Sequence, residues 1–479
     1  MLEASDSGML SPGWAHAEVE IVSDQSWIAA ALRVEVALAK CQADLGLIPR
    51  DAAEIIEVVA GSLQIDPRLL ARGVYEASNP AVELVRILQQ EVDRVVPSTS
   101  NYVHVGATSQ DILDSASMLV CTQALHKLQT NLGAARGHLV ELMRTTSAIP
   151  MVGRTVSQHA VPMTFGVKAA TWLNLLIDVE LEVRGHLDSG LPLSLAGAAG
   201  TLAAYGEYGT QATGQRFDPF SLVDAVADAL ALNPHYQPWH TARTPIARIA
   251  STLAMVSGVM GKIAVDIQLM SRTEIGEVCE GQGENGGISS SMPQKRNPVK
   301  STLILASAKQ VPAYALVLLQ GMVAEDERPS GSWQSEWQPL RDTLRMTLGT
   351  TALLAELIRD LQVDEARMLT NLRSTGVAVV SERLNVALTP LVGKVQARDI
   401  LRRLLLAGIT EPTELLPKLR RELVDLGVVD QVNLEQLLVP EDYVGSSAEI
   451  VRRALVRSEQ IQAQELLTDE SGRSTAESG

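Results

Sequence analysis

Apolar residues recur at alternating spacings of four and three along two long stretches in the middle of the chain. The first stretch, residues 248–270, carries them at Ile249, Leu253, Val256, Met260, Ile263, Ile267 and Met270. The second carries them at Met118, Cys121, Leu125, Leu128, Leu132, Ala135, Leu139 and Leu142. This heptad pattern predicts long helices that pack along a common seam. At about 1.5 Å per residue, each helix should be at least ~30 Å long.

Several positions between the seam residues of the first stretch are also small or apolar, including Ala254, Gly258 and Ala264. A helix with this composition is buried on more than one side. The pattern therefore predicts a large helical bundle that subunits could share. Gly258, Gly261 and the scarcity of charges beside the seam argue against an isolated coiled-coil rod.

The length of the helical patterns changes along the chain and predicts an all-α protein with three domains. Residues 1–107 form a first helical region, and the long helices occupy 108–362. Shorter helical patterns follow over 363–467 and indicate a smaller C-terminal domain. The polar ending 468–479 predicts a disordered tail.

The composition agrees with packed helices and narrows the class of protein. Of the 479 residues, 46% are hydrophobic but only 3% are aromatic, so aliphatic side chains supply the apolar mass. A net charge of −16 argues against non-specific nucleic-acid binding and against attraction to an anionic membrane. The net charge does not exclude a small anionic substrate, because a binding site needs only local positive charge.

Two further features point to the cytoplasm. The three cysteines, Cys41, Cys121 and Cys279, show neither a paired motif nor metal-ligand spacing, which fits a reducing compartment. No basic leader and no uncharged apolar run of about 18 residues is found, so we expect neither a signal peptide nor a membrane span.

Polar segments interrupt the helical patterns and carry the candidate chemistry. In residues 100–114, Thr108 and Ser109 come just before a long helix, where hydroxyl and N–H groups suit a carboxylate or phosphate. An ordinary helix cap would use the same residues. His104, between two valines, is either a core histidine or a ligand.

The second polar segment, residues 152–166, contains Thr155, Gln158 and His159 ahead of another long helix. Pro162 suits the start of that helix. His159 is a candidate general acid because histidine titrates near neutral pH, although a structural histidine is the alternative.

The third segment reads GQGENGGISSSMPQKRNP, residues 281–298. Its glycines satisfy GxGxxG, but a helical pattern precedes them instead of a strand, and Glu284 would repel a pyrophosphate. Nucleotide binding is therefore not supported, and neither is a hydrolase triad. Lys295, Arg296 and Asn297, close to serines, could stabilise a carboxylate, an oxyanion or a serine alkoxide.

Taken together, three motifs resemble those of the fumarase/aspartase superfamily of lyases. They are Thr108–Asp111 (TSQD), Gly153–Ala160 (GRTVSQHA) and Ser289–Pro298 (SSSMPQKRNP). The segments PWHTAR at 238–243 and ERPSGSWQSEWQPL at 327–340 are similar to the 3-carboxy-cis,cis-muconate cycloisomerase branch. The resemblance covers nearly the whole chain.

The resemblance implies a three-domain, mainly α-helical protomer whose central helices form the core of a homotetramer. Three subunits would contribute to each site, and a small dicarboxylate would be the substrate. Neither a cofactor nor a metal is implied. A non-catalytic relative is disfavoured, because Ser289, Lys295, Asn297 and His159 are all present.

The implied chemistry is anti β-elimination from a substituted succinate, which gives fumarate. By motif position, Ser289 would be the base, with Ser290 and Ser291 as alternatives. Lys295 and Asn297 would hold a substrate carboxylate, and His159 would assist the leaving group. The remaining predicted substrate-binding residues are Thr108, Ser109, Thr155, Gln158, His104 and Arg243.

Departures from the family pattern bear on the substrate. Val156 stands where many relatives have a ring, which favours a small leaving group, and elimination of nitrite from nitrosuccinate fits this description. The Arg-Tyr motif of adenylosuccinate lyases is absent near the N-terminus, so a nucleotide substrate is less favoured. The alternatives are lactonisation of 3-carboxy-cis,cis-muconate and an adenylosuccinate- or argininosuccinate-type elimination.

Overall fold

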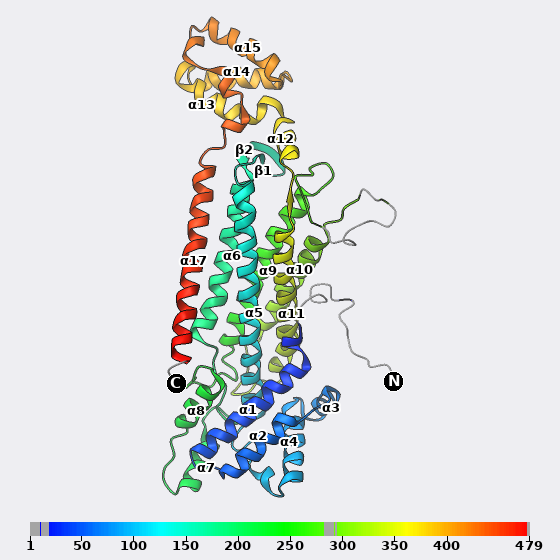
Figure 1. Ribbon diagram of the computed structural model, residues 1–479, viewed down its shortest axis with the longest axis vertical. Coiled ribbons are helices and arrows are strands. Elements are labelled where there is room, and N and C mark those ends of the chain that lie inside the picture. Colours follow the sequence, from blue (N-terminus) through cyan, green and yellow to red (C-terminus); the bar gives the residue numbers. More distant parts are fainter. Residues whose placement is uncertain (1–9, 11–18, 282–291, 293–294, 477–479) are drawn as a thin grey trace. The chain divides into compact units, whose positions relative to one another are not determined.

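The computed structural model describes residues 10, 19–281, 292 and 295–476, with side chains up to residue 464. Helices dominate this part of the chain and confirm the predicted all-α class (Figure 1). The first helices are α1 Asp24–Asp44, α2 Arg50–Ser62, α3 Pro67–Ala77, α4 Ala81–Val95, α5 Ser109–Thr146, α6 Phe165–Ser189, α7 Ala203–Thr213, α8 Phe220–Leu230 and α9 Thr244–Met270. The later helices are α10 Val299–Gln320, α11 Ser332–Arg359, α12 Glu365–Arg373, α13 Ser381–Val392, α14 Lys394–Leu406, α15 Pro412–Asp425, α16 Leu434–Leu437 and α17 Ser447–Ala476.

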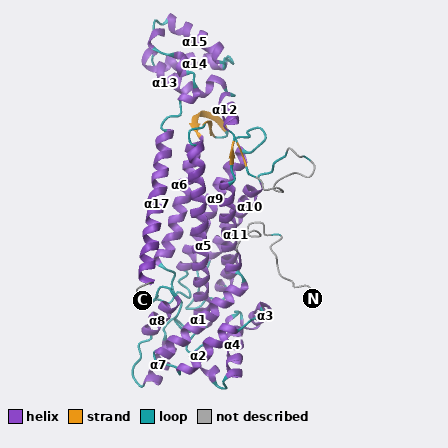
Figure 2. Ribbon diagram, viewed as in Figure 1, coloured by secondary structure: helices purple, strands orange, loops and turns teal. Residues whose placement is uncertain are grey.

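The few strands of the described residues form two small antiparallel pairs (Figure 2). β1 Pro150–Thr155 pairs with β2 Gln158–Thr164, and β3 Val278–Cys279 pairs with β4 Gln362–Val363. Short 3-10 helices connect other elements at Val19–Val22, Thr99–Tyr102, Gly376–Val380, Val429–Gln431 and Pro440–Asp442.

The chain divides into two compact units, and each is built from three separate segments. The first unit comprises residues 1–133, 179–261 and 303–353; the second comprises 134–178, 262–302 and 354–479. In the first unit, α1 packs against α2 and α8, and α2 packs against α4. In the second, α12 packs against the β1–β2 hairpin, and α13 packs against α14. The three consecutive domains proposed from the sequence stay a prediction, since both units are discontinuous.

Burial along the long helices confirms the predicted seams. All seven seam residues of α9 are at most 3% exposed. On α5 the seam is buried from Met118 to Leu139, but the next buried position is Met143, while Leu142 is only half-buried. An α-helix has about 3.6 residues per turn and therefore drifts away from a strict 3.5-residue repeat.

The predicted break over 152–166 is a β-hairpin, not a loop leading into a helix. Val156 and Ser157 form its two-residue turn with φ values of 49° and 63°, as a type I′ turn requires. A β-carbon on Gly153 would approach the Val161 carbonyl oxygen to 2.8 Å, so only glycine fits at this irregular position of β1. Pro162 lies in β2, and the helix starts later, at Phe165.

The last helix, α17, continues to Ala476 and so crosses most of the predicted disordered tail. The prediction rested on polar composition. A helix that is already nucleated adds residues at little further cost, because each new residue adds one backbone hydrogen bond. The sequence beyond residue 464 also contains Glu and Leu, which are good helix formers.

Among the described residues, α9 and α10 are long and apolar enough to cross a membrane by length and composition. This property is weak support for a membrane span, since the core helix of a bundle shares it. α9 places its whole seam in the protein interior, which accounts for its composition. The absence of a membrane partner stays a prediction.

Candidate active site

The predicted site residues fall in both units, and each unit is described by itself. The first unit holds His104, Thr108, Ser109 and Arg243. The second holds Thr155, Gln158, His159, Lys295 and Asn297. Ser289, the predicted base, lies outside the described residues, as do Ser290 and Ser291.

Thr108 stands immediately before α5 in the first unit. Its backbone N–H donates to Asp111 Oδ2 over 3.1 Å, and its hydroxyl accepts a hydrogen bond from the exposed Arg328 guanidinium. Ser109 begins the helix and is half-buried. A helix N-terminus, a hydroxyl and an arginine thus meet at one place, and this combination suits a carboxylate.

The Asp111 carboxylate, which is fully buried, fixes the loops around this helix end. Its oxygens accept hydrogen bonds from Thr108 N–H, Ala196 N–H (2.9 Å), Gly197 N–H (3.0 Å), the Tyr205 hydroxyl (3.3 Å) and His240 Nε2 (2.9 Å). Burial, together with Asp111, raises the pKa of Tyr205 well above its usual value, so the phenol stays protonated and donates. Asp111 therefore acts as a structural anchor for Thr108.

His104 lies four residues before Thr108 in a left-handed conformation, with φ of 64°. Its Nδ1 lies 2.6 Å from Glu35 Oε1. Burial opposes the charged imidazolium, but the Glu35 carboxylate outweighs it, and the pKa of His104 is raised. The structure gives His104 a protein partner, and its predicted contact with substrate stays a prediction.

The His104–Glu35 pair should make stability depend on pH. Because the folded-state pKa is raised, its stabilising contribution is complete below about pH 6.5 and is lost as pH rises through the folded-state value. We expect His104→Gln to reduce the fall in Tm between about pH 6 and pH 8.5. Scanning calorimetry at several pH values measures this slope, with exposed His126→Gln as the matched control. An identical slope in wild type and His104→Gln would contradict the assignment.

Arg243, predicted to bind substrate, is instead held inside the first unit. Its side chain is 2% exposed and lies between Asp114 (2.7 Å) and Glu336 (2.6 Å). The five N–H donors of its guanidinium all have acceptors: Asp114, Glu336 and the Trp239 carbonyl oxygen. With every donor occupied, Arg243 has none left for a substrate carboxylate in this arrangement, which indicates a structural role; its predicted contact with substrate stays a prediction.

In the second unit, a partly buried ion pair holds the β1–β2 hairpin near its turn, where Arg154 lies opposite His159. Arg154 donates to both oxygens of Glu277 over 2.8 and 2.6 Å, and Glu277 is fully buried. Asn371 of α12 donates to the same carboxylate over 2.9 Å. Bidentate geometry of this kind fixes orientation as well as contact.

The hairpin presents the predicted polar residues at its tip. Thr155, Gln158 and His159 are exposed, and Val156 is 97% exposed. A positive φ is rare for a β-branched residue and costs on the order of 1–3 kcal/mol. The backbone conformation of Val156 at the exposed tip therefore costs free energy, which the rest of the hairpin offsets.

His159 contacts Thr375, with Nδ1 and Oγ1 separated by 2.6 Å. Partial burial lowers the pKa of His159, and the neighbouring Arg154 lowers it further. The imidazole is therefore mainly neutral at neutral pH. A neutral imidazole is a weak proton donor, which limits its predicted role as a general acid.

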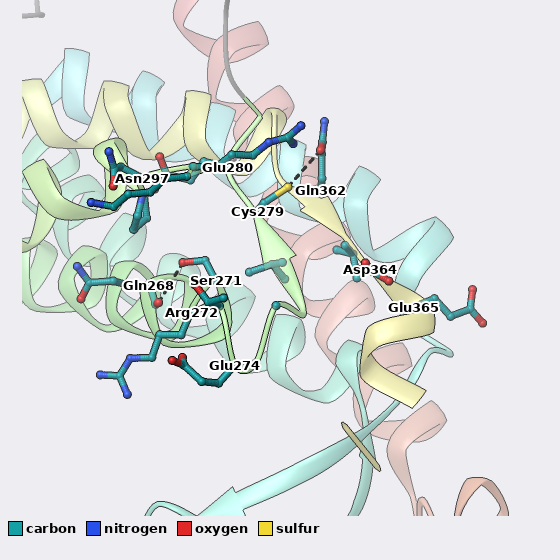
Figure 3. Close-up of a pocket in the computed structure, with 17 residues that line it drawn as sticks. Gln268, Ser271, Arg272, Glu274, Cys279, Glu280, Asn297, Gln362, Asp364 and Glu365 are labelled. Atoms are coloured by element: carbon teal, nitrogen blue, oxygen red, sulfur yellow. Dashed lines mark hydrogen bonds between the residues drawn. The ribbon is translucent and has the colours of Figure 1, made fainter. Parts of the chain in front are cut away.

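Lys295 and Asn297 line a cleft of about 1020 Å³ in the second unit. Figure 3 shows Asn297 and Glu280 across this cleft from Gln268 and Arg272. Lys295 is exposed and Asn297 is half-buried. The cleft is large enough for a dicarboxylate.

Sequence reasoning missed several residues that shape the site. Asp111 lies inside the quoted TSQD motif and Arg328 inside ERPSG, so both were visible as parts of motifs. Glu277 and Glu280 lie in the stretch before residue 281 where the sequence predicts a helix, whereas the structure has the short strand β3 between them. The neighbouring sequence does not indicate which cations or N–H groups donate hydrogen bonds to these carboxylates.

Comparisons with known proteins agree with this architecture. A sequence model of the lyase family matches residues 10–313. The chain is 44% identical to the nitrosuccinate lyase of Streptomyces davaonensis over 451 residues, which cover 94% of each chain. It is 34% identical over 450 residues to the 3-carboxy-cis,cis-muconate cycloisomerase of Bradyrhizobium diazoefficiens, covering 94% of this chain and 98% of the relative.

Solved structures give the same result. The 3-carboxy-cis,cis-muconate lactonizing enzyme of Pseudomonas putida matches with a TM-score of 0.83 and 32% identity, covering 92% of this chain and 97% of that one. A fumarate lyase from Mesorhizobium sp. BNC1 matches with a TM-score of 0.78 and 32% identity, covering 91% and 96%. The chain belongs to the lyase family of the fumarase/aspartase superfamily, and it is an enzyme.

Proposed function

We propose that this enzyme catalyses β-elimination of nitrite from nitrosuccinate and releases fumarate. The observation that carries the proposal is the 44% identity to a nitrosuccinate lyase along almost the whole chain. The identity to the muconate cycloisomerases is lower, 34% for the relative described above. A base removes one proton from the carbon next to a carboxylate, and the C–H electrons form the double bond of fumarate. Nitrite leaves with the C–N bonding electrons.

Stabilisation of the carbanion is the main electrostatic requirement of this reaction. When the proton leaves, negative charge spreads onto the adjacent carboxylate, which becomes an aci-carboxylate. Lys295 and Asn297 are the cleft residues that we assign to this carboxylate. Thr108, Ser109 and Arg328 at the start of α5 are assigned to the second carboxylate.

The leaving group is the second requirement. Nitrite is a stable anion and needs little protonation as it departs. The lowered pKa of His159 and the apolar Val156 of the same hairpin suit such a leaving group better than one that requires a strong acid. We assign the proton abstraction to Ser289, which would act as an alkoxide stabilised by Lys295.

Association into a homotetramer is part of the proposal. The end of α10 and the turn after it expose apolar side chains on the first unit: Leu316 is 55% exposed and Leu319 39% on the helix, and Met322 is 46% and Val323 86% exposed in the turn. Apolar side chains exposed together at the end of a long helix suit contact with another copy of the chain. Each complete site would then combine the α5 start, the hairpin tip and the cleft residues of three subunits, in the cytoplasm.

Lactonisation of 3-carboxy-cis,cis-muconate is the second candidate, favoured by the similarity to the cycloisomerases. Side-by-side steady-state assays separate the two functions. We expect kcat/KM for nitrosuccinate to exceed that for 3-carboxy-cis,cis-muconate by at least about 10³-fold, a ratio typical of a site built for one substrate. Fumarate is followed by absorbance and the lactone by chromatography. Faster lactone formation would overturn the proposal in favour of the cycloisomerase.

A further inference from the structure

Glu280 is a buried carboxylate directly before segment 281–298. It caps α10, which begins directly after that segment. Its side chain accepts hydrogen bonds from Lys300 N–H (2.9 Å), Ser301 N–H (2.8 Å) and the Ser301 hydroxyl (2.6 Å). Glu280 is 6% exposed and Ser301 is fully buried. The N-terminus of α10 is thereby joined to a residue about 20 positions earlier in the chain.

The neighbouring residues join the same two chain segments to the end of α11. Gly281 N–H donates to the Asp360 carbonyl oxygen over 2.9 Å, and a β-carbon at Gly281 would come within 2.3 Å of that oxygen. The Lys300 ammonium lies 3.1 Å from the Asp360 carboxylate and 3.3 Å from Glu356. Residues 280–281 and 300–301 therefore meet at one point within the second unit.

The α10 cap differs in origin from the local caps of α3 and α12. Asp66 and Asp364 cap α3 and α12 as local residues, each accepting from a backbone N–H two or three positions later. Glu280 and the α10 N-terminus that it caps instead lie on either side of segment 281–298 in the sequence. A local side chain could have accepted the same hydrogen bonds from the first N–H groups of α10. The long-range cap therefore also fixes the distance between residue 280 and the start of α10.

We infer that Glu280 is a positioning residue, which holds Lys295 and Asn297 in place by fixing the N-terminus of α10. All three residues line the same cleft, and Asn297, two residues before the start of α10, precedes the capped Ser301 by four positions. The inference rests on the proposed function, because it assumes that Lys295 and Asn297 stabilise the developing carboxylate charge. Glu280 itself touches no reacting atom in this account.

Glu280→Gln tests the inference, with Asp66→Ala as a matched control that removes a local helix cap elsewhere. A displacement of about 1 Å can cost on the order of 10²-fold in rate. We expect Glu280→Gln to lower kcat by about that factor and to change KM much less. Asp66→Ala should lower Tm without changing kcat, and Glu280→Asp should recover part of the lost kcat.

Hydrogen exchange of the backbone amides at 295–297 and 299–301 provides a readout that does not require turnover. Faster exchange in Glu280→Gln, together with the loss in kcat, supports the inference. Unchanged exchange overturns it, as does faster exchange with kcat and KM both unchanged, which is the result for a purely structural cap. Failure of the proposed function would appear differently, as a wild-type enzyme that forms no fumarate from nitrosuccinate.

Discussion

Ser289→Ala should lower kcat for fumarate formation by at least about 10³-fold while leaving the fold and the oligomeric state of the wild type unchanged. General-base catalysis contributes about 10² to 10⁴-fold in typical enzymes, and no hydroxyl remains at this position to abstract the proton. Steady-state assays at saturating substrate measure the loss. Calorimetry and light scattering on the same preparation establish that the variant is folded and has the same oligomeric state as the wild type.

The two following serines make the experiment specific. Ser290→Ala and Ser291→Ala remove the same hydroxyl group from adjacent positions of the same motif, so they are matched controls. We expect both to retain most of the wild-type kcat. Retained activity in Ser289→Ala would refute the assignment, and the serine whose removal abolishes turnover would replace it.

An ordinary serine is too weak a base for this step, so Ser289 needs a neighbouring group that stabilises its alkoxide. A free hydroxyl cannot remove a carbon-bound proton, and an alkoxide is stable only beside cations and N–H donors in a site that excludes water. Lys295 lies six positions after Ser289 in the same motif. The proposal therefore predicts that the base depends on this lysine as much as on the serine.

Arg243→Met should reduce the free energy of unfolding by about 3–5 kcal/mol, the usual cost of breaking a buried ion pair on one side. The substitution leaves Asp114 and Glu336 close together with no cation between them, and both are 2% exposed. Burial already raises the pKa of Glu336 despite the attraction of Arg243. Removal of the arginine should raise it further, so the loss of stability should be larger at alkaline than at acidic pH.

Thermal or urea unfolding of the purified variant measures this loss. Arg243→Lys is the appropriate second variant, because a lysine keeps the charge but cannot form the two-sided, five-donor arrangement. We expect an intermediate loss for it. Unchanged unfolding with a raised KM would contradict the structural role and restore Arg243 as a substrate-binding residue.

The helical seams could be predicted from the sequence because burial acts through a regular repeat. The seam residues of α9 are buried as the heptad pattern required, and α5 departs from it only at Leu142. The hairpin at 150–164 could not be predicted in the same way. Type I′ turns usually contain Asn-Gly, and a Val-Ser turn gives no such signal.

The candidate site shows a similar division between local and distant interactions. Thr108 lies at the start of a helix, as its local sequence predicted. Arg243 could not be assigned from sequence, because its partners are 129 residues before it and 93 residues after it. The same applies to Glu280, whose role depends on where α10 begins in space.

The most direct test of the central claim is one progress curve in which fumarate and nitrite are both quantified after mixing the wild-type enzyme with nitrosuccinate. Fumarate is read by absorbance and nitrite by diazo coupling. The account predicts equal amounts of the two products at every time, formed far faster than in the enzyme-free control. Product formation no faster than the spontaneous reaction, or fumarate without matching nitrite, would contradict it.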